Sequence, residues 1–125
     1  MDFDNKRPIY IQLLEDFKLK ISGKEWLPGQ KIDTVRNLAD TYKVNPNTVQ
    51  RALQELEREG LAEANRTVGR FVTTNKELID KLANSAFYEA CDGLIDVAKT
   101  LEINKEKSIK MLDEYWKEGE NNERD

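Results

Sequence analysis

Several residue types that carry chemistry are scarce or missing in this chain of 125 residues. There is no histidine, and Cys91 is the single cysteine. The lack of histidine argues against a conventional zinc site and against histidine-based acid–base catalysis, and one cysteine cannot form an internal disulfide. The chain also lacks a phosphate-binding glycine loop and a nucleophile placed next to a base. These absences predict a protein that is not an enzyme and that needs no metal and no cofactor.

Long apolar runs are missing as well. No segment approaches the ~18 consecutive apolar residues of a membrane span, and the start, Met-Asp-Phe-Asp-Asn, has no apolar signal core. We therefore expect a cytoplasmic protein without a membrane partner. The length fits one small domain with an appendage.

Residues 44–60 have the pattern of a short capped helix that presents a polar face. Asn45 suits the N-cap, Pro46 suits the first helical position, and Gly60 stands where a C-terminal glycine belongs. One face is an apolar stripe of Val49, Ala52, Leu53 and Leu56. The other face of the first two turns carries side chains that hydrogen-bond base edges and phosphates, namely Asn47, Thr48, Gln50 and Arg51. This pattern is typical of a DNA recognition helix.

The preceding segments predict the elements that support this helix. Residues 34–43 begin with the capping residue Thr34 and place Val35, Leu38, Ala39 and Tyr42 on one side. Only residues 43–45 separate this second helix from the recognition helix, so the two must cross steeply, as in a helix-turn-helix. A helix over residues 7–22 carries a further apolar stripe, which we expect to form the core beneath them: Tyr10, Leu13, Leu14, Phe17 and Ile21.

A β-hairpin wing is expected after the recognition helix. Residues 61–64 and 70–74 are short strand-like runs, and the link over residues 65–69 contains a glycine suited to a hairpin loop. Arg66 and Arg70 bracket the tip of this hairpin. Ordinary solvated surface would explain them, but beside a recognition helix we favour contact with phosphate or with the minor groove.

Seven segments of the chain together resemble a known family. They are Pro8-Ile-Tyr-Ile-Gln-Leu, Ile21-Ser-Gly with Leu27-Pro-Gly-Gln-Lys-Ile, Thr34-Val-Arg-Asn-Leu-Ala, Val44-Asn-Pro-Asn-Thr-Val, Leu56-Glu-Arg-Glu-Gly-Leu and Gly69-Arg-Phe-Val. In this order, over residues 7–73, they are similar to the GntR transcription regulators. The Asn-Pro-Asn-Thr-Val-Gln segment and the short C-terminal region resemble the YtrA subfamily. The resemblance implies a winged helix-turn-helix, mainly α with a small β-hairpin wing, in a dimeric bacterial DNA-binding protein, more often a repressor than an activator.

The resemblance also implies DNA contacts at the positions where the family's motifs match. These are Arg36 at the start of the second helix, Asn45, Asn47 and Thr48 at the start of the recognition helix, and Gly69 at the wing tip. Together with the residues chosen above for their chemistry, the predicted DNA-binding set is Arg36, Asn45, Asn47, Thr48, Gln50, Arg51, Arg66, Gly69 and Arg70.

The chain departs from the family pattern at three positions. Many members have arginines where this chain has Pro46 and Gln50, which lowers the positive charge offered to phosphate. The family's usual acidic residue after the second-helix arginine is Asn37 here, which weakens the reciprocal capping box with Thr34.

The formal net charge of −4 is unevenly distributed along the chain. Residues 1–75 hold twelve Lys/Arg and eleven Asp/Glu, a net of +1, whereas residues 76–125 hold eight and thirteen, a net of −5. The acidity therefore lies away from the expected DNA face. Because +1 is only weakly basic, we expect modest non-specific affinity for DNA.

After residue 75 the apolar pattern predicts two helices, one over residues 76–101 and a second capped by Asn104. Two helices alone cannot cover so much apolar surface, so the economical interpretation is a homodimer in which four helices complete one core. Alternatively, the pair folds back on its own winged helix. The predicted interface residues are Ile79, Leu82, Ala83, Ala86, Phe87, Ala90, Leu94, Leu112 and Trp116.

The sequence thus predicts a DNA-binding domain over residues 1–75, a dimerisation region over 76–118 and a frayed polar tail over 119–125. We expect a sequence-specific regulator, a repressor, that binds an inverted repeat in double-stranded DNA as a homodimer. The side-chain amides of Asn47 and Gln50 can pair bidentately with adenine, so A·T pairs are expected. The alternative is a winged-helix module that docks a protein and does not bind DNA. No residue identifies a small-molecule effector, and two helices leave little room for a pocket of ~300 Å³ or more.

Overall fold

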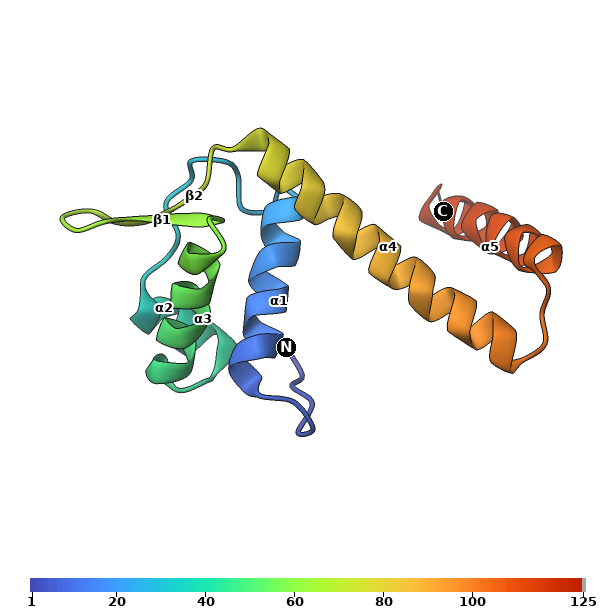
Figure 1. Cartoon of the computed structure of the whole chain (residues 1–125), viewed down its shortest axis with the longest axis horizontal. Coiled ribbons are helices and arrows are strands. Elements are labelled where there is room, and N and C mark those ends of the chain that lie inside the picture. The colour runs from blue at the N-terminus through green and yellow to red at the C-terminus, as the bar shows by residue number, and fades with distance from the viewer. Residues whose placement is uncertain (125) are drawn as a thin grey trace. The chain divides into compact units, whose positions relative to one another are not determined.

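The computed structural model describes residues 1–124, which form five helices and one two-stranded antiparallel sheet (Figure 1). The elements are α1 (Ile9–Ser22), α2 (Val35–Tyr42), α3 (Pro46–Arg58), β1 (Ala62–Asn65), β2 (Gly69–Val72), α4 (Lys76–Thr100) and α5 (Lys105–Arg124). The predicted fold class, mainly α with a small hairpin and two C-terminal helices, is confirmed. No helix formed by these residues is both long and apolar enough to cross a membrane.

The chain divides into two compact units. Unit 1 comprises residues 1–86, and unit 2 comprises the described residues from 87 onward, so the division falls inside α4. We expected the division at residue 75 from the change in apolar pattern. The first turns of α4 instead belong to unit 1, because Ile79 is buried in its core and Leu78 and Leu82 pack against that core.

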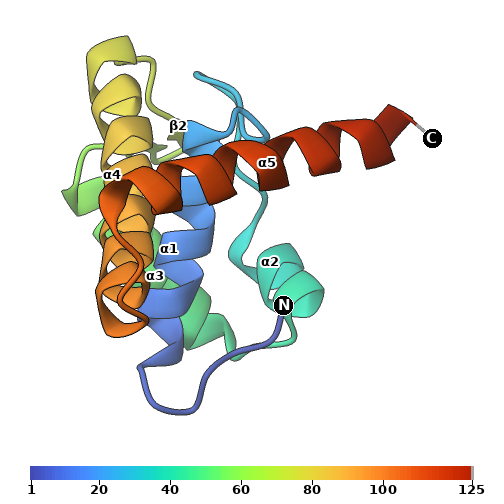
Figure 2. The ribbon, with the colours of Figure 1, turned by 90° about the vertical axis from the view of Figure 1, so that its right-hand side faces the viewer.

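The core of unit 1 lies among α1, α2 and α3, which Figure 2 shows as one group of helices. Phe17 and Ile21 of α1 and Leu53 of α3 are fully buried. The Trp26 ring stacks on Phe17, with ring centroids 5.1 Å apart. The predicted apolar stripe of α1 is therefore core, except that Tyr10 stays partly exposed.

A hydrogen bond between two helices braces α2 against α1. The Tyr42 hydroxyl donates to Asp16 Oδ2 at 2.6 Å, and the Tyr42 ring packs edge-on against Phe17 with centroids 5.8 Å apart. Burial, and next the hydrogen bond to Asp16, raises the pKa of Tyr42 well above its ordinary value. The hydroxyl thus stays protonated and keeps donating, which holds α2 in place for the turn into α3.

The ends of α2 are fixed by side-chain caps and a left-handed residue. Thr34 Oγ1 accepts from the Asn37 backbone N–H at 3.1 Å, and Asn37 Nδ2 donates to Asp33 Oδ1 at 2.9 Å. The Thr34 backbone N–H, which a capping box would satisfy from residue 37, donates instead to Asp33 Oδ1 at 2.9 Å. Lys43 ends the helix at φ 57°, which allows the tight turn into α3 that the sequence predicted.

The wing is a hairpin in which Ala62 pairs with Val72 and Asn65 with Gly69. The first predicted strand, 61–64, was thus displaced by one residue, and the second, 70–74, begins one residue and ends two residues earlier than predicted. A third segment was not predicted: Ile32 N–H donates to the Arg70 carbonyl at 2.8 Å, and Lys31 forms an isolated bridge with Phe71. Because β2 is paired on both edges, the base of the wing is held firmly on unit 1.

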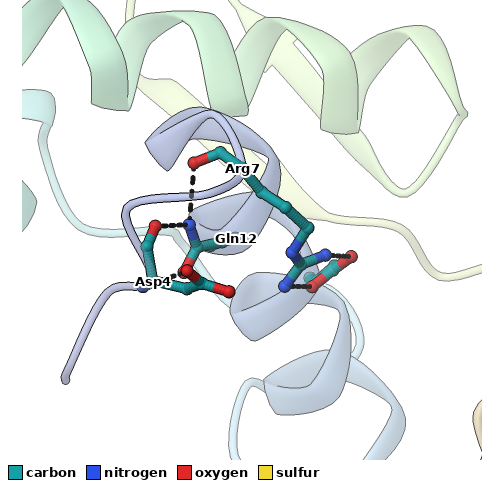
Figure 3. Close-up of polar contacts among 4 residues, drawn as sticks. Asp4, Arg7 and Gln12 are labelled. Carbon is teal, nitrogen blue, oxygen red and sulfur yellow. Dashed lines mark hydrogen bonds and ion pairs between the residues drawn. The ribbon is translucent and has the colours of Figure 1, made fainter.

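A buried glutamine ties the N-terminal segment to α1 (Figure 3). Gln12 Oε1 accepts from the Asp4 backbone N–H at 2.7 Å, while Gln12 Nε2 donates to the carbonyls of Asp4 at 2.6 Å and Arg7 at 3.0 Å. Arg7 Nη1 also pairs with Glu15 Oε1 at 2.8 Å. The buried amide is therefore satisfied, and residues 4–7 are anchored to the helix.

Unit 2 consists of the second part of α4 and α5, and none of its residues up to 121 is buried. Asn104 Oδ1 accepts from the Lys107 backbone N–H at 2.8 Å, which confirms the predicted cap of α5. The tail predicted to fray over residues 119–125 is helical as far as Arg124, and Asp125 lies outside the described residues. Within this last part of α5, Glu120 Oε1 accepts a hydrogen bond from Trp116 Nε1 at 3.0 Å.

Candidate DNA-binding surface

The exposed face of α3 follows directly from which of its side chains are buried. Val49, Leu53 and Leu56 are fully buried, so the helical repeat turns Asn47 away from the core and leaves it exposed. Gln54 lies on the same outward face and is exposed as well. Sequence reasoning missed Gln54, although its spacing, four residues beyond Gln50, was a signal.

Asn45 is occupied by the backbone of its own helix. Its Oδ1 accepts from the Asn47 backbone N–H at 2.8 Å, and Pro46 fills the first helical position without losing a hydrogen bond. The predicted N-cap is therefore confirmed. The side-chain amide nitrogen of Asn45 remains the group that a phosphate can reach.

Arg51 lies toward α1. Its guanidinium carbon stands 3.8 Å from the centroid of the Tyr10 ring, a cation–π arrangement. A surface hollow at this point is lined by Ile9, Tyr10, Asn47, Thr48 and Arg51. Thr48, which is partly buried, and Arg51 thus lie at the junction of α3 with the start of α1.

Arg70 reaches α3 from β2 of the wing, where it pairs with Ala64 one residue from the tip. Its Nε pairs with Glu57 Oε1, and its Nη1 donates to Gln50 Oε1 at 3.5 Å. The Arg70 and Glu57 side chains are only 20% and 28% exposed. Sequence reasoning placed Arg70 at the DNA but did not foresee Glu57, because the two residues meet only after the hairpin folds back.

Two other predicted contacts are open to solvent. Arg36 is the second residue of α2, Arg66 lies in the hairpin loop, and both side chains are exposed. Within residues 1–124 neither arginine takes part in an ion pair. Their full charge is therefore available to phosphate.

The wing tip brings a further cation into place. Gly69 has φ 124°, a conformation that favours glycine, and a Cβ added there would lie 3.3 Å from Lys31 Cε. Sequence reasoning missed Lys31, whose exposed side chain lies beside the wing because its backbone bridges Phe71.

The predicted interface residues fall into two groups. Ile79 is 5% exposed in the core of unit 1, so its side chain cannot contact a second chain, and Leu82 packs partly against the same core. Burial therefore removes Ile79 from the surface that a second chain could contact, whereas the half-buried Leu82 stays a predicted interface residue. Ala83 and Ala86 are half-buried, whereas the rest are exposed, namely Phe87, Ala90, Leu94, Leu112 and Trp116.

Unit 2 contains an apolar hollow between α4 and α5, with a volume of about 430 Å³. Leu94, Ala98, Ile109 and Leu112 are among its lining residues. Two helices were expected to leave little room for a pocket of ~300 Å³ or more, and this hollow is larger than that. Ser108 also lines it, and its buried hydroxyl has no hydrogen-bond partner within residues 1–124.

Two short helices joined by a tight turn and followed by a hairpin define a winged helix-turn-helix. The family model for bacterial regulatory proteins of the gntR family matches residues 9–72. The chain belongs to the GntR family of bacterial regulatory proteins.

Two relatives from Bacillus subtilis are similar to the chain over different lengths. The HTH-type transcriptional regulator YhcF is 34% identical over 117 residues, which cover 94% of this chain and 97% of YhcF. The HTH-type transcriptional repressor YtrA is 39% identical over 75 residues, which cover 60% of this chain and 58% of YtrA. Similarity to YhcF therefore includes the C-terminal helices.

Solved structures are likewise similar to the chain either over most of its length or over its N-terminal part alone. A GntR family transcriptional regulator from Listeria monocytogenes has a TM-score of 0.83 at 34% identity and covers 90% of this chain and 98% of its own. The AraR DNA-binding domain in complex with the operator ORX1 has a TM-score of 0.54 at 28% identity, and covers 58% of this chain and 93% of its own.

Proposed function

We propose that this protein is a sequence-specific transcription regulator, a repressor of the YtrA subfamily, that binds an inverted-repeat operator as a homodimer. The observation that carries the proposal is the polar side of α3, where the exposed Asn47 and the half-buried Gln50 stand three residues apart outside the buried stripe. Amide side chains at that spacing reach neighbouring base edges when a helix lies in the major groove.

The surroundings of α3 supply the contacts that fix its position on DNA. Arg36 lies in the first turn of α2, and Arg66 lies in the loop of the wing. These exposed cations lie on the elements that precede and follow α3 in the chain, and phosphate contacts from them would fix the position of α3 in the groove. The operator complex of the AraR domain, which shares this fold, supports the same use of the surface here.

Unit 2 supports the homodimer. Phe87 and Trp116 are each 63% exposed, and no residue of 87–121 is buried. An apolar surface of this kind marks a protein interface. We assign the second copy of the chain as its partner, because a two-fold dimer places two α3 helices on paired half-sites.

The repressor role and the subfamily rest on similarity to YtrA, which is described as a repressor. A repressor of this kind occupies its operator and so blocks transcription, and operator binding alone is sufficient for that effect. The proposed partners are therefore double-stranded operator DNA and a second copy of this chain.

One alternative function has an observation in its favour. Arg70 is paired with Glu57 and Arg51 is held over Tyr10, so two of the predicted DNA-binding arginines already have contacts within the protein. A winged helix that docks a protein does not need free arginines, so these internal contacts would not weaken its function. A DNA-binding protein with the same contacts would depend on Arg36 and Arg66 for its phosphate contacts.

Selection of bound fragments from the source genome with the full-length protein separates the two functions. We expect the enriched fragments to share an inverted repeat with half-sites about one DNA turn apart. Enrichment without two-fold symmetry would contradict the homodimeric mode of binding. The absence of any enriched sequence, with folded protein, would favour the protein-docking module.

A further inference from the structure

The contacts of Arg70 determine which way the amide of Gln50 faces. Gln50 and Glu57 are seven residues apart in α3, which places them on the same face two turns from each other. Arg70 of β2 reaches both, with Nε on Glu57 Oε1 and Nη1 on Gln50 Oε1. A guanidinium only donates hydrogen bonds, so the Gln50 atom that faces it must be the oxygen. The amide nitrogen of Gln50 is therefore the end left for other partners.

Both the backbone and the side chain of Arg70 are held in place by hydrogen bonds. Its carbonyl accepts from the Ile32 backbone N–H at 2.8 Å, which anchors β2. Its side chain pairs with the Glu57 carboxylate, and the two are mostly buried, at 20% and 28% exposure. Charge-assisted hydrogen bonds in partly buried sites are the stronger ones, so Glu57 holds Arg70 against Gln50.

The orientation of an amide decides which base it recognises. Bidentate pairing with adenine needs both ends, because the oxygen accepts from N6 and the nitrogen donates to N7. Guanine instead presents two acceptors, O6 and N7, to the major groove, whereas thymine presents one, O4. Arg70 occupies one of the two lone pairs of the Gln50 oxygen and turns that end of the amide toward β2, while both amide hydrogens stay free to donate. The free end of Gln50 therefore offers donors, which match the two acceptors of guanine best.

We propose that Glu57 and Arg70 are positioning residues that make Gln50 a hydrogen-bond donor, so that the operator carries guanine where Gln50 reads it. This inference rests on the proposed function, namely that α3 reads the operator. It replaces the adenine expected for Gln50 from its residue type alone. Asn47 has no side-chain hydrogen bond within residues 1–124 and keeps its preference for adenine.

The test is a binding-site selection on four full-length proteins: wild type, Gln50→Ala, Arg70→Met and Glu57→Ala. Gln50→Ala identifies the symmetric pair of positions that Gln50 reads. Wild type should prefer guanine there. Arg70→Met removes the donor while keeping an unbranched side chain, so the freed oxygen should shift the preference from guanine to adenine by roughly fivefold or more. Glu57→Ala should weaken the guanine preference in the same direction.

Arg66→Met is the matched control, because it removes a wing arginine that does not contact Gln50. It should lower affinity for all sequences and leave the base preference unchanged. Circular dichroism of each variant shows that it is folded, and Glu57→Ala provides the answer if Arg70→Met does not fold.

The outcomes separate the inference from the proposed function. An operator with adenine or thymine at the Gln50 position, or a preference that stays the same in Arg70→Met and Glu57→Ala, would overturn the positioning role while α3 remained the reader. If Gln50→Ala left the base preference unchanged at every operator position, Gln50 would not read a base. The positioning role and the proposed base contact of Gln50 would then both be wrong.

Discussion

Units 1 and 2 bury their apolar side chains to very different degrees. In unit 1, Leu13, Phe17 and Leu53 have no exposed surface, and α1, α2 and α3 enclose them. In unit 2, Phe87 and Trp116 keep 63% of their surface exposed although both lie in long helices. Since burial of apolar area is the main favourable term in folding, unit 1 carries its own stabilisation. Unit 2 gains comparable stabilisation only when a second surface covers it.

The largest expected effect is a core deletion in unit 1. Phe17→Ala removes a fully buried ring that also contacts Trp26 and Tyr42. We expect the free energy of unfolding to fall by ~3–5 kcal/mol, from lost transfer energy and the cavity left behind. Urea unfolding measures this. A loss below ~1 kcal/mol would mean that unit 1 is not organised around this core.

A charge placed on the exposed apolar face of unit 2 should act on association. Phe87→Glu, and independently Leu94→Glu, would put a carboxylate into the proposed dimer core, where burying an unpaired charge is unfavourable. We expect the dimer dissociation constant to rise by about a hundredfold or more, which corresponds to ~2.7 kcal/mol. Sedimentation equilibrium measures the constant.

The control for those variants is Ile79→Val, which alters a residue of the unit 1 core. It should lower the unfolding free energy by ~0.5–1.5 kcal/mol and leave the dimer constant unchanged. If Ile79→Val dissociated the dimer as strongly as Phe87→Glu, the division between the two units would be misplaced.

The exposed arginines of unit 1 should dominate the salt dependence of DNA binding, because unit 2 lies in the acidic part of the chain. Arg36→Ala should weaken binding to every DNA sequence and lower the salt-dependence slope by roughly one unit per lost phosphate contact in each half-site. Lys110→Ala, in α5, should leave the slope unchanged. A change confined to one base identity would show that Arg36 reads sequence.

The two asparagine caps give the smallest effects and compare the units directly. Asn45 Oδ1 and Asn104 Oδ1 each accept a backbone N–H at 2.8 Å. Replacement by alanine should cost ~1 kcal/mol at either site. For Asn45→Ala the loss should not depend on protein concentration, whereas for Asn104→Ala it should appear in the concentration-dependent transition of the dimer. Identical behaviour of the two variants in thermal melts would contradict this distinction.

Local signals were sufficient to predict much of this fold. The caps at Thr34, Asn45 and Asn104 and the glycine at position 60 lie within a few residues of the helix ends they define, so their chemistry could be read directly from the sequence. The buried stripes of α1 and α3 followed from helical spacing. These features depend on neighbours in sequence, and the structure places them as expected.

Contacts between distant segments could not be predicted in the same way. The bridge from Lys31 to Phe71 and the pairing of Arg70 with Glu57 require the hairpin to fold back first. Ile79 continues the apolar pattern of α4 without interruption, so nothing in the spacing showed that it belongs to unit 1. The residue types of the DNA face could be predicted from the sequence. The contacts of Arg70 with Glu57 and of Arg51 with Tyr10 could not, because they depend on tertiary packing.

The proposed function requires that unit 2 joins two chains, so that two α3 helices read one operator. Native mass spectrometry of the full-length protein, alone and with the selected duplex, tests it most directly. We predict two chains per particle in both samples, with one duplex bound in the second. A single chain in solution together with a single chain on the duplex would contradict the claim.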